Sequence, residues 1–237
     1  MNILIAGASR GLGLELVMEA LERGHSVIAG VRNPEEKGSR LQQLAGSDSD
    51  PNIRERLQLV KLDVQDESSI AEAAADLNNK GISLHAIVNN AAILNARNTP
   101  IEELDLNDVQ TAFDINLFGP IRVVKHMLPL LSEAEASIIN VSSEAGSLTN
   151  AYPNDYPYGM TKTALNMFTL QLGSLLKGRD TQVLSVHPGW MRTDMGGEEA
   201  ALDPRASAKG ILDLIERRTA VSSRYHFVDY TGADMTI

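Results

Sequence analysis

The chain has 237 residues, of which 43% are hydrophobic, so it is large enough to bury the core of one α/β domain. Its formal net charge of -10 disfavours binding to the nucleic-acid backbone, because proteins that bind nucleic acid usually present a basic face. The absence of cysteine excludes disulfides, a thiol nucleophile and thiolate metal sites.

The N-terminal stretch predicts a strand, a glycine turn and the start of a helix. The apolar run 3–6 leads into Gly7-x-x-x-Gly11-x-Gly13, after which the apolar residues take a helical period. Gly7 permits a tight turn, Gly11 allows the backbone to approach a ligand, and Gly13 allows helix and strand to pack closely. Because the N–H groups of a helix start suit a phosphate, the stretch predicts a dinucleotide site. An ordinary strand-to-helix turn is the alternative.

The rest of the chain alternates between strand and helix patterns. Strands are predicted at 3–6, 26–31, 57–64, 84–89, 137–143, 182–186 and 225–229. Helices are predicted at 11–24, 34–45, 66–80, 107–131 with an interruption at Gly119-Pro120, from the end of a 144–157 loop to about 177, and at 204–218, with further loops at 46–52 and 190–203. This order predicts that residues 1–237 form a single-domain Rossmann fold, a seven-stranded parallel sheet with helices on both faces. Ligands are then expected at the carboxyl ends of the strands, near the switch point between the first and fourth.

Several motifs place chemistry at those strand ends or on the two long helices between them. They are Gly7-x-x-x-Gly11-x-Gly13, Asn89-Asn90-Ala91, Asn116 before Leu117-Phe118-Gly119, Ser142-Ser143, Tyr158-x-x-x-Lys162 and Pro188-Gly189. In this order and spacing they resemble the short-chain dehydrogenase/reductase family over essentially the whole chain. The runs 187–195 and 227–230 resemble the subgroup that contains C-factor and the sniffer-type carbonyl reductases.

The resemblance implies that Tyr158 is the reacting group. An isolated phenol has a pKa of ~10 and needs a nearby cation to act as a base near neutrality. Lys162 follows four residues later, on the same helix face, whereas neither Tyr152 nor Tyr156 has a lysine at that spacing. In the family the lysine also binds the nicotinamide ribose, and the tyrosine exchanges a proton with the substrate oxygen. An ordinary exposed Tyr–Lys contact is the alternative.

The resemblance also implies two supporting residues. Ser143 would hold the substrate oxygen, with Ser142 as the alternative, and the gap from Ser143 to Tyr158 is slightly longer than the family's usual one. Asn116 would support the lysine through a helix irregularity and a bound water, unless it is only an asparagine in a distorted helix. The implied catalytic set is Asn116, Ser143, Tyr158 and Lys162.

The choice of cofactor rests on charge. Val31 stands where NAD sites often carry an acid, with Arg32 next to it and Arg10 inside the glycine turn. Two guanidinium groups could bracket a 2′-phosphate, which predicts NADP(H). Alternatively, both arginines are solvated surface charges, and Glu35 or Glu36 serves a ribose hydroxyl.

Other cofactor contacts are implied by the resemblance. Asp63 and Val64 resemble the family's adenine-binding pair, although a turn-forming aspartate explains Asp63 equally well. Asn89 would stabilise the central strand and line the cofactor cleft, and Thr193 would hold the nicotinamide carboxamide or only cap a helix. No metal site is predicted. The predicted cofactor set is Gly7, Ser9, Arg10, Gly11, Leu12, Gly13, Arg32, Asp63, Val64, Asn89, Ala91, Tyr158, Lys162, Pro188, Gly189 and Thr193.

Together these features predict an NADP(H)-dependent oxidoreductase that transfers hydride between the nicotinamide and a carbonyl or secondary alcohol. Residues 190–205 are expected to form a substrate lid, with Trp190 and Met191 lining an apolar pocket. An NADP(H)-binding signalling protein with little turnover and an NAD-linked alcohol dehydrogenase are the alternatives.

Assembly and location are also expectations. The resemblance implies a homodimer or homotetramer formed through the helices at about 107–131 and 156–177. No signal peptide is recognised, and no apolar run approaches the roughly 20 residues of a membrane span, so we expect a cytoplasmic protein.

Overall fold

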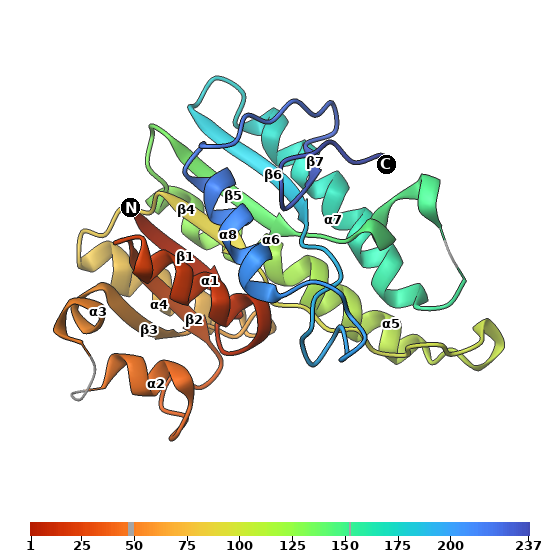
Figure 1. The fold of residues 1–237 in the computed structure, drawn as a ribbon, viewed down its shortest axis with the longest axis horizontal. Helices are drawn as coiled ribbons and strands as arrows, with labels where there is room; N and C mark the ends of the chain where they lie inside the picture. Colours follow the sequence, from red (N-terminus) through yellow and green to blue (C-terminus); the bar gives the residue numbers. More distant parts are fainter. Residues whose placement is uncertain (47–49, 152) are drawn as a thin grey trace.

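The computed structural model describes residues 1–46, 50–151 and 153–237, in which a seven-stranded sheet lies between two layers of helices (Figure 1). The strands are β1 (Asn2–Ala6), β2 (Ser26–Val31), β3 (Leu57–Lys61), β4 (Ala86–Asn89), β5 (Ala136–Val141), β6 (Thr181–His187) and β7 (Phe227–Asp229). The α-helices are α1 (Gly11–Glu22), α2 (Arg40–Ala45), α3 (Pro51–Arg56), α4 (Glu67–Asn79), α5 (Leu106–Phe113), α6 (Gly119–Met127), α7 (Tyr156–Leu175) and α8 (Pro204–Ile215).

The strand order confirms the predicted Rossmann fold and its switch point. The sheet runs β3-β2-β1-β4-β5-β6-β7 and every neighbouring pair is parallel. The chain therefore builds outward from β1 in one direction and from β4 in the other. At the carboxyl end of β1, Ala6 pairs with Gly30 of β2 on one side and with Asn89 of β4 on the other. The connections after β1 and β4 diverge there, which opens a crevice for a ligand.

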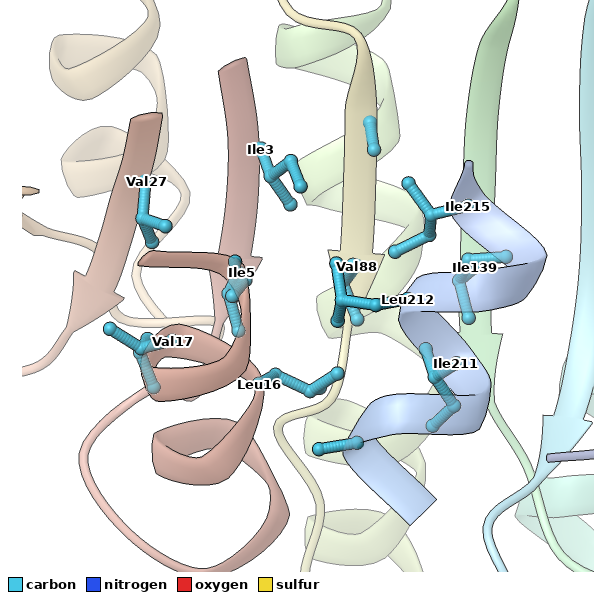
Figure 2. Close-up of a cluster of buried hydrophobic side chains, with 14 of the residues drawn as sticks. Ile3, Ile5, Leu16, Val17, Val27, Val88, Ile139, Ile211, Leu212 and Ile215 are labelled. Carbon is cyan, nitrogen blue, oxygen red and sulfur yellow. The ribbon is translucent and has the colours of Figure 1, made fainter. Parts of the chain in front are cut away.

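The core has one cluster on each face of the sheet. Successive side chains of a strand point to opposite faces, so Ile3 and Ile5 of β1 face α1 and α8, while Leu4 and Ala6 face α4, α6 and α7. All four are essentially inaccessible to solvent, which explains why β1 reads as an unbroken apolar run. Figure 2 shows the first cluster, in which α1 and α8 lie side by side over β1, β4 and β5.

The segment between β2 and β3 differs from its prediction. The helix expected at 34–45 begins only at Arg40, because Gly38 takes a left-handed φ of 81° and Ser39 then caps the helix by accepting from the Gln42 amide. A further helix, α3, begins inside the loop expected at 46–52, where Asp50 caps it ahead of Pro51. Residues 47–49 of that expected loop lie outside the described residues.

Two strands end earlier than predicted, and one long helix is divided. β3 ends at Lys61 and β5 at Val141, because the side chains of Asp63 and Ser143 accept backbone N–H groups and turn the chain. The helix expected at 107–131 is α5, a π-helical turn over Asp114–Phe118, α6 and a short 3-10 turn. Pro120 has no N–H to offer the carbonyl four residues earlier, which accounts for the break in α-helical pairing.

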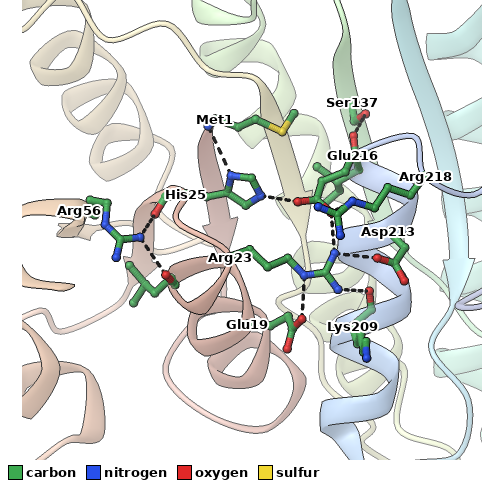
Figure 3. A network of polar contacts seen from close by, with 12 residues as sticks. Met1, Glu19, Arg23, His25, Arg56, Ser137, Lys209, Asp213, Glu216 and Arg218 are labelled. Atoms are coloured by element: carbon green, nitrogen blue, oxygen red, sulfur yellow. Dashed lines mark hydrogen bonds and ion pairs between the residues drawn. The ribbon is translucent and has the colours of Figure 1, made fainter. Parts of the chain in front are cut away.

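A polar network joins the two helices that cover one face (Figure 3). Arg23 at the end of α1 donates to Glu19 and to Asp213 and Glu216 of the α8 region, each at 2.5–2.7 Å. His25 contacts the same Glu216 carboxylate at 2.7 Å. Burial raises the pKa of Glu216, but the hydrogen bonds from His25 and Arg23 outweigh it and hold that pKa below its usual value.

We expect Glu216→Gln to lower the free energy of unfolding at pH 7 by about 1.5–3 kcal/mol, the range for hydrogen bonds to charged groups. Because the pKa of Glu216 is depressed in the folded state, its contribution is present above the unfolded pKa and is lost as pH falls through the folded pKa. The difference between wild type and variant should therefore shrink below about pH 4.3, the ordinary glutamate pKa.

Denaturant unfolding at several pH values measures this difference. Glu22→Gln is the matched control, because Glu22 lies on the exposed face of α1 with only a 3.8 Å ion pair to Arg205, and it should change stability by less than about 0.5 kcal/mol. Equal effects of the two substitutions would show that the network does not stabilise the fold.

Candidate active site

A cavity of about 740 Å³ lies at the carboxyl ends of the strands, within the size range of small-molecule sites. It is lined by the turn after β1, the ends of β2 to β6, the start of α7 and the segment that follows β6. Of the residues predicted from sequence to form the site, all but Gly13, Asn89 and Asn116 line this cavity.

The glycine turn packs tightly against the end of β4. A Cβ on Gly7, which has φ 80°, would lie 2.7 Å from the Cα of Ala91, and a Cβ on Gly13 would lie 2.1 Å from the carbonyl oxygen of Gly7. Asn90 reinforces this approach, since its side-chain amide donates to the same Gly7 oxygen at 2.8 Å. Gly13 is therefore a packing position that touches the turn and not the cavity. Asn90 was not predicted as a site residue, although the Asn-Asn pair of its motif was the available signal.

The start of α1 offers backbone donors to the cavity. Arg10 precedes the helix with an extended backbone and provides no side-chain cap. Gly11 and Leu12 at the helix start line the cavity. The first amides of a helix without a cap carry partial positive charge and favour an anionic ligand. The charge and the free amides of this helix start therefore suit a dinucleotide pyrophosphate.

Positive charge lies at the end of β2, as predicted. Arg32 follows the buried Val31 and is exposed at the cavity edge, whereas neither Glu35 nor Glu36 lines the cavity. Arg10 lies on the same rim and contacts Asp194 at 3.3 Å, with both side chains more than 70% exposed. Such an exposed ion pair is weak, so the Arg10 guanidinium remains able to turn toward an anion.

Asp63 forms the turn after β3 and also lines the cavity. Its carboxylate accepts from the Gln65 amide at 3.1 Å, which makes the turn after β3. Asp63 and Val64 both line the cavity as well. A side chain held by its own turn is a fixed acceptor, so the turn positions the carboxylate for a ligand.

Tyr158 and Lys162 lie one turn apart on α7, as their spacing predicts. The Lys162 ammonium is 5.4 Å from the centre of the Tyr158 ring and donates to the carbonyl oxygen of Val141 at 2.7 Å. The lysine side chain is buried, and this burial lowers the pKa of Lys162 to about 7. Tyr152, one of the two rival tyrosines, lies outside the described residues.

The geometry favours Ser143 over Ser142 as the serine that holds the substrate oxygen. Ser142 is buried, and its hydroxyl donates to the Asn166 side chain at 2.7 Å. Ser143 Oγ accepts from the Ala145 amide at 3.2 Å, which uses a lone pair and leaves the hydroxyl proton to donate toward the cavity. Ser143 can therefore serve as a donor to a substrate oxygen.

Asn116 lies in the π-helical turn, which is a helix irregularity of the kind that the resemblance implies. Its side chain accepts from the Ile93 amide at 2.8 Å and donates to the Ile93 carbonyl and to Thr161 Oγ1 at 3.0 and 3.1 Å. Among the described residues, these contacts do not include Lys162. Asn116 joins the loop after β4 to α7 through Ile93 and Thr161. Thr161 directly precedes Lys162, so Asn116 supports the helix turn that carries the lysine.

Asn89 does not line the cleft, contrary to the prediction. Its side chain is buried beside its register partner, Asn140 of β5, and donates to that side chain at 2.8 Å on the face of the sheet that α7 covers. The chain turns toward the cavity only at Asn90. The role in stabilising the central strand agrees with this contact.

The segment after β6 closes back on itself beside the cavity. The Leu202 amide donates to the Trp190 carbonyl at 3.1 Å, and the Arg192 amide donates to the Leu202 carbonyl at 2.9 Å. The Trp190 indole donates to the Gly196 carbonyl at 2.8 Å, and the Gly196 amide donates to Thr193 Oγ1 at 3.1 Å. Trp190 and Thr193 both line the cavity.

In the part of the chain that the structure describes, no helix has the length and apolar character needed to cross a membrane. In the same residues, no three His, Cys, Asp or Glu side chains gather in a way that could hold a metal ion.

Known proteins share this fold and much of this sequence. The NADPH-bound carbonyl reductase from chicken fatty liver matches with a TM-score of 0.86 and 30% identity, covering 100% of this chain and 98% of that chain. The carbonyl reductase Sniffer of Drosophila melanogaster matches with a TM-score of 0.87 and 30% identity, covering 100% and 99%. C-signal of Myxococcus xanthus is 34% identical over 151 residues, which cover 63% of this chain and 90% of C-signal.

The family follows from these likenesses and from the site. A profile of the short chain dehydrogenase family matches residues 1–203. The predicted resemblance to the subgroup of C-factor and sniffer-type carbonyl reductases is confirmed by the same relatives. The chain therefore belongs to the short-chain dehydrogenase/reductase family, and it is an oxidoreductase of the carbonyl reductase kind.

Proposed function

We propose that this protein reduces carbonyl compounds with NADPH, or oxidises the corresponding secondary alcohols with NADP⁺, in the cavity at the carboxyl ends of the strands. One observation carries the proposal. Tyr158, Lys162 and Ser143 line the same cavity as the glycine turn, so a bound dinucleotide and a carbonyl substrate can meet there.

The chain offers a binding group for each part of the cofactor. The uncapped amides at the start of α1 suit the pyrophosphate, and Arg10 and Arg32 suit the 2′-phosphate. Asp63 is a fixed acceptor for the adenine amine, and Thr193, which lines the same cavity, suits the carboxamide. When bound, the nicotinamide supplies or accepts the hydride.

The protein's own residues manage the proton and the charge. Ser143 donates a hydrogen bond to the substrate oxygen as negative charge develops on it. Tyr158 then transfers its hydroxyl proton to that oxygen. Lys162 is held beside the Tyr158 ring by the Val141 carbonyl, and its ammonium stabilises the phenolate that remains. The signalling alternative with little turnover is not favoured, since Ser143, Tyr158 and Lys162 share one cavity with the glycine turn.

The substrate class is the finer part of the proposal. Residues 190–205 are proposed to cover the substrate end as a lid, supported by the backbone pairing of Trp190 and Arg192 with Leu202. Trp190 and Met191 line the cavity together with Met195, so apolar or aromatic carbonyl compounds fit this end. Purified protein should therefore oxidise NADPH with aromatic aldehydes, diketones or quinones at a lower KM than with short aliphatic aldehydes.

Tyr158→Phe should abolish proton transfer while leaving the cavity shape intact. We expect kcat/KM for NADPH-dependent reduction to fall by roughly 10²- to 10⁴-fold, the usual size of a general-acid contribution. NADPH affinity, measured by fluorescence titration, should change little. Tyr156→Phe is the matched control on the same helix start and should keep its activity. Equal activity of the two variants would argue against Tyr158 as the proton donor.

Arg32→Ala should shift cofactor preference from NADPH toward NADH. Loss of a charge-assisted hydrogen bond to a phosphate is worth about 1.5–3 kcal/mol, or roughly 10- to 100-fold in the ratio of the two affinities. Comparing kcat/KM for both cofactors measures the shift. Arg40→Ala removes an exposed arginine of α2 that lies outside the cavity lining, and it should not change the ratio. An unchanged ratio in both variants would favour the NAD-linked alternative.

A homodimer or homotetramer through α5, α6 and α7 is part of the proposal. It is supported by apolar side chains that these elements and the adjoining π-helical turn expose, among them Phe118, Met160 and Met167 at 45–57%. Sedimentation velocity is expected to give a dimer or tetramer, and a monomer at high concentration would contradict it. The cytoplasmic location stays a prediction that cell fractionation can test.

A further inference from the structure

His187, the last residue of β6, contacts the chain segment that carries Ser143. Its imidazole Nδ1 accepts a hydrogen bond from the backbone N–H of Glu144 at 3.2 Å. That N–H belongs to the peptide group directly after Ser143. His187 also lines the cavity with Ser143 and Tyr158. The proposed reaction gives it no role so far.

The hydrogen bond from the Glu144 amide to His187 takes the place of the next backbone hydrogen bond between β5 and β6. The last ladder bond between these strands runs from the Ser142 amide to the Val186 carbonyl at 2.8 Å. In a parallel ladder the next amide facing the same neighbour is two residues on, at Glu144. The chain bends there, because Ser143 caps the short 3-10 turn Glu144–Gly146. The Glu144 amide therefore takes the His187 side chain as its acceptor.

This partner determines the state of the imidazole. A backbone N–H can only donate, so Nδ1 must be unprotonated and the proton of the neutral ring must lie on Nε2. The Glu144 carboxylate on the same turn and Asp229 at the end of β7 favour the charged ring, while Tyr158 and Lys162 share the cavity from α7. Burial outweighs the two carboxylates and lowers the pKa of His187.

We infer that His187 is a positioning residue that holds the Ser143–Glu144 peptide and thereby aims the Ser143 hydroxyl at the substrate oxygen. A protonated imidazole has two N–H donors and no acceptor, so protonation of His187 breaks this contact and releases the turn. The effect on turnover rests on the proposed function, whereas the contact and its response to pH do not.

Two nearly isosteric substitutions separate the hydrogen bond from the shape. His187→Asn places a carboxamide oxygen where it can accept the Glu144 N–H without titrating, and His187→Leu fills similar space with no acceptor. With NADPH and 4-nitrobenzaldehyde as the probe, we expect His187→Leu to lower kcat about tenfold, the effect of losing the one hydrogen bond that holds the Ser143–Glu144 peptide. His187→Asn should stay within about threefold of wild type, because it restores the acceptor. NADPH affinity should be the same in all three proteins.

The pH dependence of kcat/KM tests whether protonation of His187 breaks its contact with the Glu144 amide. Because protonation removes the acceptor, wild-type kcat/KM should fall on the acid side below about pH 6.5, the ordinary histidine pKa. The profile of His187→Asn should lack this fall. His126→Asn is the matched control: His126 lies on α6 and contacts Glu67, away from the cavity, so its profile should match wild type. Equal losses in the Asn and Leu variants, or an acid fall that persists in His187→Asn, would overturn the inference.

Nuclear magnetic resonance of the protein without cofactor gives a readout that needs no turnover. The His187 ring nitrogens should report the Nε2–H form at neutral pH, and the Glu144 amide resonance should move with the same midpoint as the ring. In His187→Asn that movement should vanish, and its persistence would refute the contact. If no carbonyl probe is reduced but the Glu144 amide follows His187, the proposed function fails while the positioning contact is supported.

Discussion

The structure depends on the close approach of the turn after β1 to the end of β4. A Cβ on Gly7 would meet the Ala91 backbone at 2.7 Å, and the Asn90 amide holds the Gly7 carbonyl at 2.8 Å. This contact sets the two diverging halves of the sheet at their switch point, where the crevice opens. The same contact directs the start of α1, and so its amide donors, into the cavity.

Helix α7, which carries Tyr158 and Lys162, is held to the sheet by a buried row of polar side chains. Asn89 donates to Asn140 at 2.8 Å, Asn140 donates to Thr169 of α7 at 2.9 Å, and Thr169 contacts Ser185 of β6 at 2.7 Å. The register that pairs Asn89 with Asn140 and Asn140 with Ser185 aligns this row across three strands. These three buried contacts tie α7 to β4, β5 and β6, so the row positions α7 and with it Tyr158 and Lys162.

Sequence reasoning located most of the site because its signals are local. The glycine spacing, the i,i+4 pair Tyr158 and Lys162, and the strand ends were each visible in a few neighbouring residues. Asn89 was misplaced because the partner that holds its side chain, Asn140 of β5, is distant in sequence and becomes its neighbour only when the strands pair in register. Likewise, the direct partners of Asn116 are Ile93 and Thr161, which are distant in sequence, and the pattern around Asn116 contains no trace of them.

The sequence by itself determined the fold class and the family, and it predicted Tyr158 and Lys162 as the reacting pair, because periodicity and motif spacing are properties of the chain. Only the tertiary structure decided that Ser142 turns to Asn166 while Ser143 faces the cavity, and that His187 holds the amide of Glu144. The physical reason is that each choice depends on which backbone and side-chain groups of distant elements still need a partner once the sheet has formed. Which groups remain unpaired depends on strand register and on where each strand ends. Neither can be read from a short stretch of sequence.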